Sequence, residues 1–137
     1  MATVVFYEKP GCSTNTRQKV LLAAAGHTVI AKNLLTEPWT KERLLSFFGN
    51  RPVAEWFNRA APRIKSGEVI PEALDAEIAI AMMRAEPLLI RRPLIEAEGR
   101  REVGFDAGAI DVWLGLNGRV EADLETCQKG HAAKPCQ

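Results

Sequence analysis

The sequence predicts an α/β fold in which a β-α-β unit, a helical insert and a β-β-α unit follow one another. Two short β-branched runs flank a helix-length segment near the start of the chain. The middle of the chain has the apolar spacing of helices. Strand character then returns around a glycine-centred turn, and a last helix follows. These four strands form a mixed sheet, because the first pair is parallel and the second pair is a hairpin.

The first unit begins with the strand TVVFY at 3–7, whose β-branched and aromatic residues are typical of a buried strand. A Lys-Pro-Gly turn follows at once, and residues 13–25 favour a helix. Gly26 stands where a left-handed C-terminal cap is usual. The segment HTVIAKNL at 27–34 predicts the second strand, which lies parallel to the first after a right-handed crossover.

The middle segment, about 40–84, predicts the helical insert. Trp39 and Leu44 have the spacing of a hydrophobic staple around an N-cap at Thr40, which indicates a helix at about 41–48. Prolines and a glycine break 51–67 into a short helix and a loop. After Pro71, acidic residues occupy the first turn of another helix, which Pro87 stops.

Two of these helices carry a stripe of residues spaced four apart. The stripes are Thr16, Val20 and Ala24 in the first helix, and Leu74, Ile78 and Met82 in the helix after Pro71. The second stripe has the spacing of a helix that packs on a core.

The second unit is the stretch LLIRRPLIEAEGRREVGF and the helix after it. It predicts strand structure on both sides of Arg92-Pro93 and a hairpin around Gly99. Asp106 is placed to cap a last helix that runs to about Leu114.

Composition and charge limit the function classes. Of 137 residues, 47% are hydrophobic, and 18 basic residues against 17 acidic ones leave a formal charge of +1. The net charge is therefore too small to attract nucleic acid or an anionic membrane surface over a long range, and we expect no direct binding to either. No stretch approaches the roughly 20 apolar residues of a membrane span. We expect a folded domain over 1–117 and a flexible tail over 118–137, which is poor in large apolar residues.

The three cysteines form an odd count at irregular spacing, which fits a reducing compartment better than a disulfide framework. We therefore expect a cytoplasmic protein with free thiols. Cys127, His131 and Cys136 are potential soft-metal ligands, but a closed zinc site usually needs four, so we expect no metal site. A tail cysteine could instead resolve an oxidised Cys12, or the tail thiols could take no part.

Cys12 is the candidate nucleophile because it stands at a strand-to-helix turn. The unpaired amides and the dipole of a helix N-terminus favour the thiolate, which is the reactive form of cysteine. Lys9 and Arg17 are cations close in sequence, although a solvated role for Arg17 is an equal alternative. The alternative for Cys12 itself is a small buried hydrophobe at a tight turn.

The loop that carries Cys12 could also hold an anion. Backbone amides over 13–16 and the hydroxyls of Ser13 and Thr14 could cradle an oxyanion beside the sulfur. Asn15 stands where a C-x-x-C motif would carry its second thiol, so Cys12 cannot run an intramolecular disulfide cycle. Its turnover then needs an outside thiol, of which glutathione is the first candidate, or a distant cysteine.

The segments "FYEKPGCSTNTRQK" and "PLLIRRPLI…GRREVGFD", with the β-α-β spacing and the helical insert, resemble the arsenate reductase family that couples to glutathione and glutaredoxin. The resemblance extends to the related Spx transcriptional regulators and covers roughly 2–116. It implies a thioredoxin-like, ArsC-like fold, a nucleophilic Cys12, and an oxyanion-binding Arg92 before a cis Pro93. "NTRQKVLLAAAGHTV" and "LLTEPWTKERLLSFFG" look most like the nitrogenase-associated branch.

The sequence departs from the arsenate reductases at the arginines. Those enzymes surround the oxyanion with three arginines, and only Arg92 is in register here. Gly104 occupies the position of the third arginine. Asn58 aligns with the remaining arginine position better than Arg59 does, but a one-residue adjustment in the loop would bring Arg59 into register. A bidentate arginine contact contributes about 1.5–3 kcal/mol, so two absent contacts predict arsenate binding weaker by about two orders of magnitude or more. Asn15 also departs from the C-x-x-C switch common in Spx proteins.

The candidate anion-binding residues are close to Cys12 in sequence or match the family's arginines. They are Ser13, Thr14, Asn15, Arg17, Arg59 and Arg92. The resemblance implies a glutathione- and glutaredoxin-dependent oxidoreductase that performs thiol transfer or oxyanion reduction, with glutathione as cosubstrate and no bound cofactor. Its partner would be glutaredoxin, glutathione or a nitrogenase-related protein. The alternative is a non-enzymatic, Spx-like interaction or regulatory module in nitrogen fixation or transcription.

The remaining notable side chains favour structural roles. We expect His27, Arg91, Arg100 and Arg101 at the surface. We expect Trp39, Trp56 and Trp113 in the core or at an interface.

Overall fold

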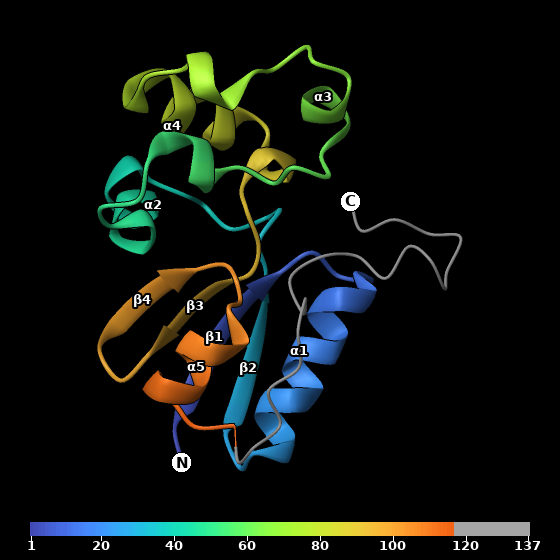
Figure 1. Ribbon diagram of the computed structural model, residues 1–137, viewed down its shortest axis with the longest axis vertical. Helices are drawn as coiled ribbons and strands as arrows, with labels where there is room; N and C mark the ends of the chain where they lie inside the picture. The colour runs from blue at the N-terminus through green and yellow to red at the C-terminus, as the bar shows by residue number, and fades with distance from the viewer. Residues whose placement is uncertain (117–137) are drawn as a thin grey trace.

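A mixed four-stranded sheet organises the chain, and its strand order is β2-β1-β3-β4 (Figure 1). The computed structural model describes residues 1–116. The strands are β1 (Thr3–Glu8), β2 (Thr28–Asn33), β3 (Leu94–Ala97) and β4 (Arg100–Val103). β1 is parallel to β2 and antiparallel to β3, which forms a hairpin with β4. The predicted α/β class and mixed four-stranded sheet are therefore confirmed.

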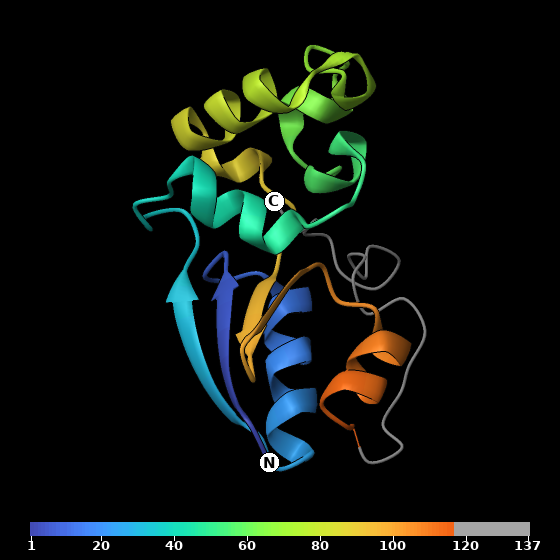
Figure 2. The same cartoon turned by 90° about the vertical axis from the view of Figure 1, so that its left-hand side faces the viewer.

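Two helices, α1 (Ser13–Ala24) and α5 (Ala107–Trp113), lie on the same face of the sheet (Figure 2). Apolar side chains that are at most 3% exposed fill the space between these helices and the sheet. They include Val4, Phe6, Leu22, Ile95, Phe105 and Ile110. Full burial of such a side chain contributes about 1.5–3 kcal/mol. Within 1–116, no helix is both long and apolar enough to cross a membrane.

An insert of short helices stands over the end of the sheet at which β1 and β2 finish (Figures 1 and 2). Its elements are α2 (Lys41–Phe48), η1 (Val53–Trp56), α3 (Pro62–Lys65), η2 (Pro71–Ala73), α4 (Ala76–Ala85) and η3 (Pro87–Leu89). Its core is aromatic: Phe48 stacks on Trp56 with ring centroids 4.7 Å apart, and Trp39 packs edge-on against Tyr7 of β1 at 5.0 Å. The insert and the sheet therefore share one hydrophobic cluster.

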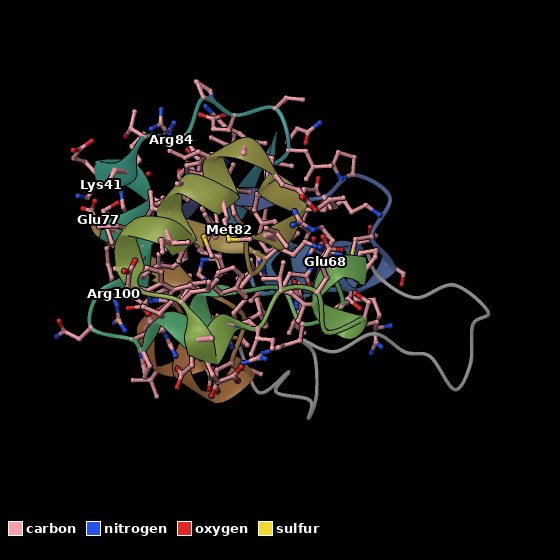
Figure 3. All side chains as sticks on the ribbon, turned by 90° about the horizontal axis from the view of Figure 1, so that it is seen from above. Lys41, Glu68, Glu77, Met82, Arg84 and Arg100 are labelled. Carbon is pink, nitrogen blue, oxygen red and sulfur yellow. The ribbon has the colours of Figure 1, made fainter. Side chains whose placement is uncertain are left out.

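Side chains seen from above the insert show an ion pair between α2 and α4 at its rim (Figure 3). The Lys41 ammonium lies 2.8 Å from a carboxylate oxygen of Glu77, and the two side chains point toward one another. Hydrogen bonding to this carboxylate raises the pKa of Lys41. Because both groups are exposed, the pair contributes little to stability.

Helix ends follow the capping residues of the sequence. The side chains of Thr40, Asp75 and Asp106 each accept a hydrogen bond from the backbone N–H three residues later, at 3.2, 2.9 and 3.1 Å. Gly26, with φ of 98°, ends α1 in the left-handed conformation that favours glycine. The caps expected at Thr40, Asp106 and Gly26 are therefore confirmed.

The packing faces of α1 and α4 differ from the predicted stripes. Val20 in α1 and Ile78 in α4 are 63% and 50% exposed. The buried face of α1 includes Leu22, and that of α4 includes Ile80 and Met83. The sequence AEIAIAMMRA is apolar at almost every position, so a four-residue spacing can be drawn along several faces. Tertiary packing decides which of these faces is buried.

Two predicted element boundaries are also wrong. The helix expected directly after Pro71 begins at Ala76, because Pro71 opens the 3-10 turn η2 and Asp75 supplies the cap. Strand structure expected before Arg92 is absent from this segment, since Pro87 begins the 3-10 turn η3 and Ile90 forms only an isolated bridge with Phe57.

His27 is buried, although a surface position was expected. It is 8% exposed, and its Nδ1 accepts a hydrogen bond from the Ala2 N–H at 3.1 Å. Its Nε2 lies 2.8 Å from the Gly115 carbonyl oxygen, to which it donates when Nδ1 is the acceptor. The left-handed turn at Gly26 directs the chain so that this imidazole joins the start of β1 to the segment after α5.

Two isoleucines of α4 test the corrected packing face. Ile80→Ala is expected to lower the free energy of unfolding by about 2–5 kcal/mol, because it leaves a cavity in the insert. Ile78→Ala on the exposed face is expected to cost about 1 kcal/mol or less. Urea unfolding of both variants measures the difference, and equal losses would contradict the assignment.

Replacing His27 tests its bridging role. His27→Ala is expected to cost about 2–3 kcal/mol of unfolding free energy, because buried partners at Ala2 and Gly115 lose their hydrogen bonds. His27→Asn can still accept from the Ala2 N–H, so we expect a smaller loss. Denaturant unfolding that shows no loss for His27→Ala would rule out the bridge.

Candidate functional site

A tight turn places Cys12 between β1 and α1. Pro10 and Gly11 occupy the two central positions, and the Cys12 N–H donates to the Lys9 carbonyl at 3.1 Å. Gly11 has φ of 86°, which the third position of a type II turn requires and which glycine adopts without strain. Cys12 is thus the N-cap of α1 because the Lys-Pro-Gly sequence reverses the chain directly after the strand.

Cys12 lies at the positive end of α1, with its side chain largely covered. It is 4% exposed and belongs to neither apolar cluster of the described chain. The first turn of α1 carries no acidic residue, so nothing there offsets the helix dipole. The Cys12 carbonyl accepts from both the N–H and the hydroxyl of Thr16, at 3.0 and 3.1 Å, which anchors the cysteine backbone to the helix.

Asn15 points into the protein instead of toward solvent. It is 2% exposed, and its Oδ1 accepts from the Lys9 N–H at 3.3 Å. Its Nδ2 donates to Oε1 of Gln18 at 3.0 Å, and Gln18 is fully buried. The side chain predicted to bind an anion is therefore used within the loop, and the backbone N–H of Asn15 in the first turn is the group suited to an anion.

Arg92 reaches the same end of the sheet through strand pairing. β3 runs antiparallel to β1 with Leu94 opposite Tyr7, so the two residues before Leu94 lie level with the chain that leaves β1 toward Cys12. The Arg92–Pro93 peptide bond is cis. The Pro93 carbonyl accepts from the Gly104 N–H at 2.8 Å, which ties this segment to the end of β4.

The guanidinium of Arg92 is buried without a protein partner in the described chain. Arg92 is 7% exposed, and no hydrogen bond or ion pair joins its side chain to another residue of 1–116. No side-chain nitrogen or oxygen in that range is both fully buried and unbonded, so the guanidinium keeps a narrow access to solvent. A charge with so little access to water is costly, although less so than a fully buried ion without a partner. An anion at this point would supply the missing partner.

The other candidates beside Cys12 lie on the first turns of α1. Ser13 and Arg17 are exposed, whereas Thr14 is 4% exposed. With Cys12, Asn15 and Arg92, they gather at one end of the sheet.

Arg59 is engaged inside the insert. Its guanidinium lies 2.6 Å from a carboxylate oxygen of Glu72 and donates to the Ala54 carbonyl at 3.2 Å. This contact lowers the pKa of the Glu72 carboxyl. The neighbouring Asn58 donates to the Leu88 carbonyl at 3.2 Å, so both residues brace the insert.

The third arginine position of the family carries Gly104, and the backbone there suits glycine. Its φ is 81°, a conformation in which a side chain is strained. Arg92 is therefore the one guanidinium that this structure brings to the candidate site from the three family positions.

Gln18 is the residue that sequence reasoning missed. Glutamine in a helix is usually exposed, but Gln18 is fully buried and accepts a hydrogen bond from Asn15 one turn earlier. The three-residue spacing of Asn15 and Gln18 was the only sign in the sequence that the two side chains could meet on one face of the helix. Within 1–116, no group of three or more His, Cys, Asp or Glu side chains could hold a metal ion. Cys127, His131 and Cys136 lie outside the described residues, as does the expected tail.

Comparison with known proteins agrees with this geometry. A protein from Rhodospirillum rubrum named "Uncharacterized 15.7 kDa protein in draG 3'region" is 53% identical over 127 residues, covering 93% of this chain and 89% of that protein. The structure of an arsenate reductase from Vibrio cholerae matches with a TM-score of 0.62 and 25% identity, over 74% of this chain and 89% of that one. An arsenate reductase (ArsC) related protein from Brucella melitensis matches with a TM-score of 0.62 and 24% identity, over 83% and 96%.

The family model described as the ArsC family matches residues 7–112. This range includes the Cys12 turn, the helical insert and the Arg92–Pro93 segment. The observed sheet and insert are those of the thioredoxin-like fold that the sequence resemblance implies. The chain belongs to the ArsC family.

Proposed function

We propose that this chain is an arsenate reductase-like thiol protein in which Cys12 attacks an oxidised, anionic substrate held by Arg92. The observation that supports it most is the buried guanidinium of Arg92 with no protein partner between 1 and 116. Retaining such a charge costs stability unless an anion binds there. Cys12 lies at the same end of the sheet, at a helix N-terminus, where a thiolate is favoured.

Two reactions fit a single thiol. In thiol transfer, the Cys12 thiolate attacks a glutathione mixed disulfide, becomes glutathionylated and releases the other thiol. A second glutathione then attacks this adduct, which restores Cys12 and forms glutathione disulfide. In oxyanion reduction, arsenate gains two electrons and loses one oxygen as water, while glutathione and glutaredoxin thiols are oxidised to a mixed disulfide. Both routes need reduced outside thiols, as the cytoplasm supplies.

The number of guanidiniums bears on the choice between these reactions. Arg59 pairs with Glu72, and Gly104 occupies the third arginine position. A site with one guanidinium in place of three binds arsenate more weakly by about two orders of magnitude or more. Thiol transfer is therefore the better supported of the two.

The same departures favour a second candidate function. A chain that lacks two of the family's arginines and the second thiol suits a non-enzymatic interaction module in nitrogen fixation or transcription, related to the Spx proteins but without their C-x-x-C switch. The nitrogen-fixation setting, and a nitrogenase-related partner, are suggested by the name of the Rhodospirillum rubrum relative, which places it in the draG 3′ region.

A coupled assay with glutathione and glutaredoxin tests the enzymatic role. We expect turnover of a glutathione mixed disulfide, slower turnover of arsenate, and loss of both in Cys12→Ser. A Cys127→Ser/Cys136→Ser variant is the control, and it should remain active because an outside thiol resolves Cys12. Absence of turnover in the wild type, with a partner protein that still binds Cys12→Ser, would favour the interaction module.

Arginine replacement tests the anion site. Arg92→Ala is expected to lower kcat/KM for the anionic substrate by about 10- to 100-fold, because a charge-assisted contact contributes about 1.5–3 kcal/mol. Arg100→Ala is the matched control, since Arg100 pairs with Glu102 on β4 and its side chain is 52% exposed. Equal effects of both replacements would exclude a specific role for Arg92.

A further inference from the structure

The amide of Asn15 connects three points around Cys12 that lie apart in the chain. Lys9 precedes the tight turn, Asn15 is in the first turn of α1, and Gln18 is one turn further along. Cys12 lies between the first two. Asn15 and Gln18 are 2% and 0% exposed, so the hydrogen bond between them is buried, whereas the bond from Lys9 is partly buried.

The direction of these hydrogen bonds follows from chemistry. A backbone N–H can only donate, so the Asn15 atom that faces Lys9 is the carbonyl oxygen. The amide nitrogen of Asn15 must then donate, and Gln18 presents its Oε1. Among side chains of this size, the asparagine amide both accepts from Lys9 and donates to Gln18. An aspartate lacks the donor, and a serine or cysteine is too short to span both partners.

Both backbone groups of Lys9, its carbonyl and its N–H, make hydrogen bonds. Its carbonyl accepts from the Cys12 N–H at 3.1 Å, which closes the turn, and its N–H donates to Asn15 at 3.3 Å. The turn that carries the sulfur is therefore attached to α1 by a side chain as well as by the backbone. Without Asn15, the Lys9 N–H and the Gln18 amide would lose a buried partner, and each loss costs about 1–3 kcal/mol.

We infer that Asn15 is a positioning residue that fixes the Cys12 turn against the first turn of α1. It thereby holds the cysteine at the helix N-terminus, where the Cys12 side chain makes no capping hydrogen bond of its own. This inference rests on the proposed function, in which Cys12 reacts as a thiolate. The position that would carry the second thiol of a dithiol protein is used here to orient the first one. A helix N-terminus held in one orientation stabilises a nearby thiolate more than a fluctuating turn does.

The test is the pH profile of Cys12 alkylation by iodoacetamide in the full chain, with Cys127→Ser and Cys136→Ser so that Cys12 is the sole thiol. Asn15→Ala is expected to move the profile to higher pH by about one unit, which is a roughly tenfold slower reaction near neutral pH. Asn15→Ser is expected to shift the alkylation profile in the same direction, and it replaces Asn15→Ala in the test if Asn15→Ala folds poorly.

Leu21→Ala is the matched control on α1. Leu21 is 8% exposed and packs in the core beneath the helix, so its replacement lowers stability without touching the Asn15 hydrogen bonds. Its alkylation profile should stay at the wild-type pH. An unmoved profile in both Asn15 variants, or an equal movement in Leu21→Ala, would overturn the positioning role and leave the proposed function intact.

The wild-type profile tests the proposed function separately. It is compared with that of the same chain unfolded in urea, in which the thiol is an ordinary one. A wild-type profile at lower pH supports thiolate chemistry at Cys12. Coincident profiles would overturn the proposed function, and the inference about Asn15 with it.

Discussion

The antiparallel pairing of β1 with β3 is the constraint on which the candidate site depends. Cys12 and Arg92 are 80 positions apart in the numbering, and a single strand pair brings their segments to one end of the sheet. Leu94 opposite Tyr7 fixes the register, and a one-residue slip would turn alternate side chains to the other face. The apolar residues of β1 and β3 resist such a slip, because they are buried between the sheet and the helices. The core is therefore what aligns the two polar groups.

The Arg92 guanidinium indicates how stability and function are divided in this fold. The two apolar clusters and the helix caps favour the folded state, whereas a largely buried cation with no partner among residues 1–116 opposes it. Natural proteins retain such groups where binding repays the cost. The Cys12 turn differs in this respect, since the buried Asn15 amide donates a hydrogen bond to the buried Gln18 side chain. The Asn15 amide is thus bonded within the described chain, whereas the Arg92 guanidinium is the group that the proposed anion would satisfy.

The order of strands and helices could be predicted from the sequence, because it is encoded locally. β-branched runs, the caps at Thr40 and Asp106 and the glycine at 26 act within a few residues of their own position. The buried faces of α1 and α4 could not be predicted, because an apolar helix offers several faces and distant elements select one. The burial of His27 depends on contacts 25 and 88 residues away.

The candidate site was predictable to the extent that it follows from local sequence. The Cys12 turn is set by the Pro-Gly dipeptide, and Arg92 was located through a family resemblance. The inward orientation of Asn15 was not predicted, because a polar residue in a first helical turn usually contacts solvent or an anion. Gln18 decides that orientation, and its burial depends on how α1 packs against the sheet.

The segment that carries Arg92 is also attached to the insert. The Asn58 N–H donates to the Leu89 carbonyl at 2.8 Å, and the Arg91 N–H donates to the Trp56 carbonyl at 2.9 Å. These bonds make a short ladder between the insert and the chain leading into β3. The segment that carries the arginine is therefore held from two sides, by the insert through this ladder and by the sheet through the pairing of β3 with β1. A substitution that loosens the insert would in this way reach the arginine without touching the strands.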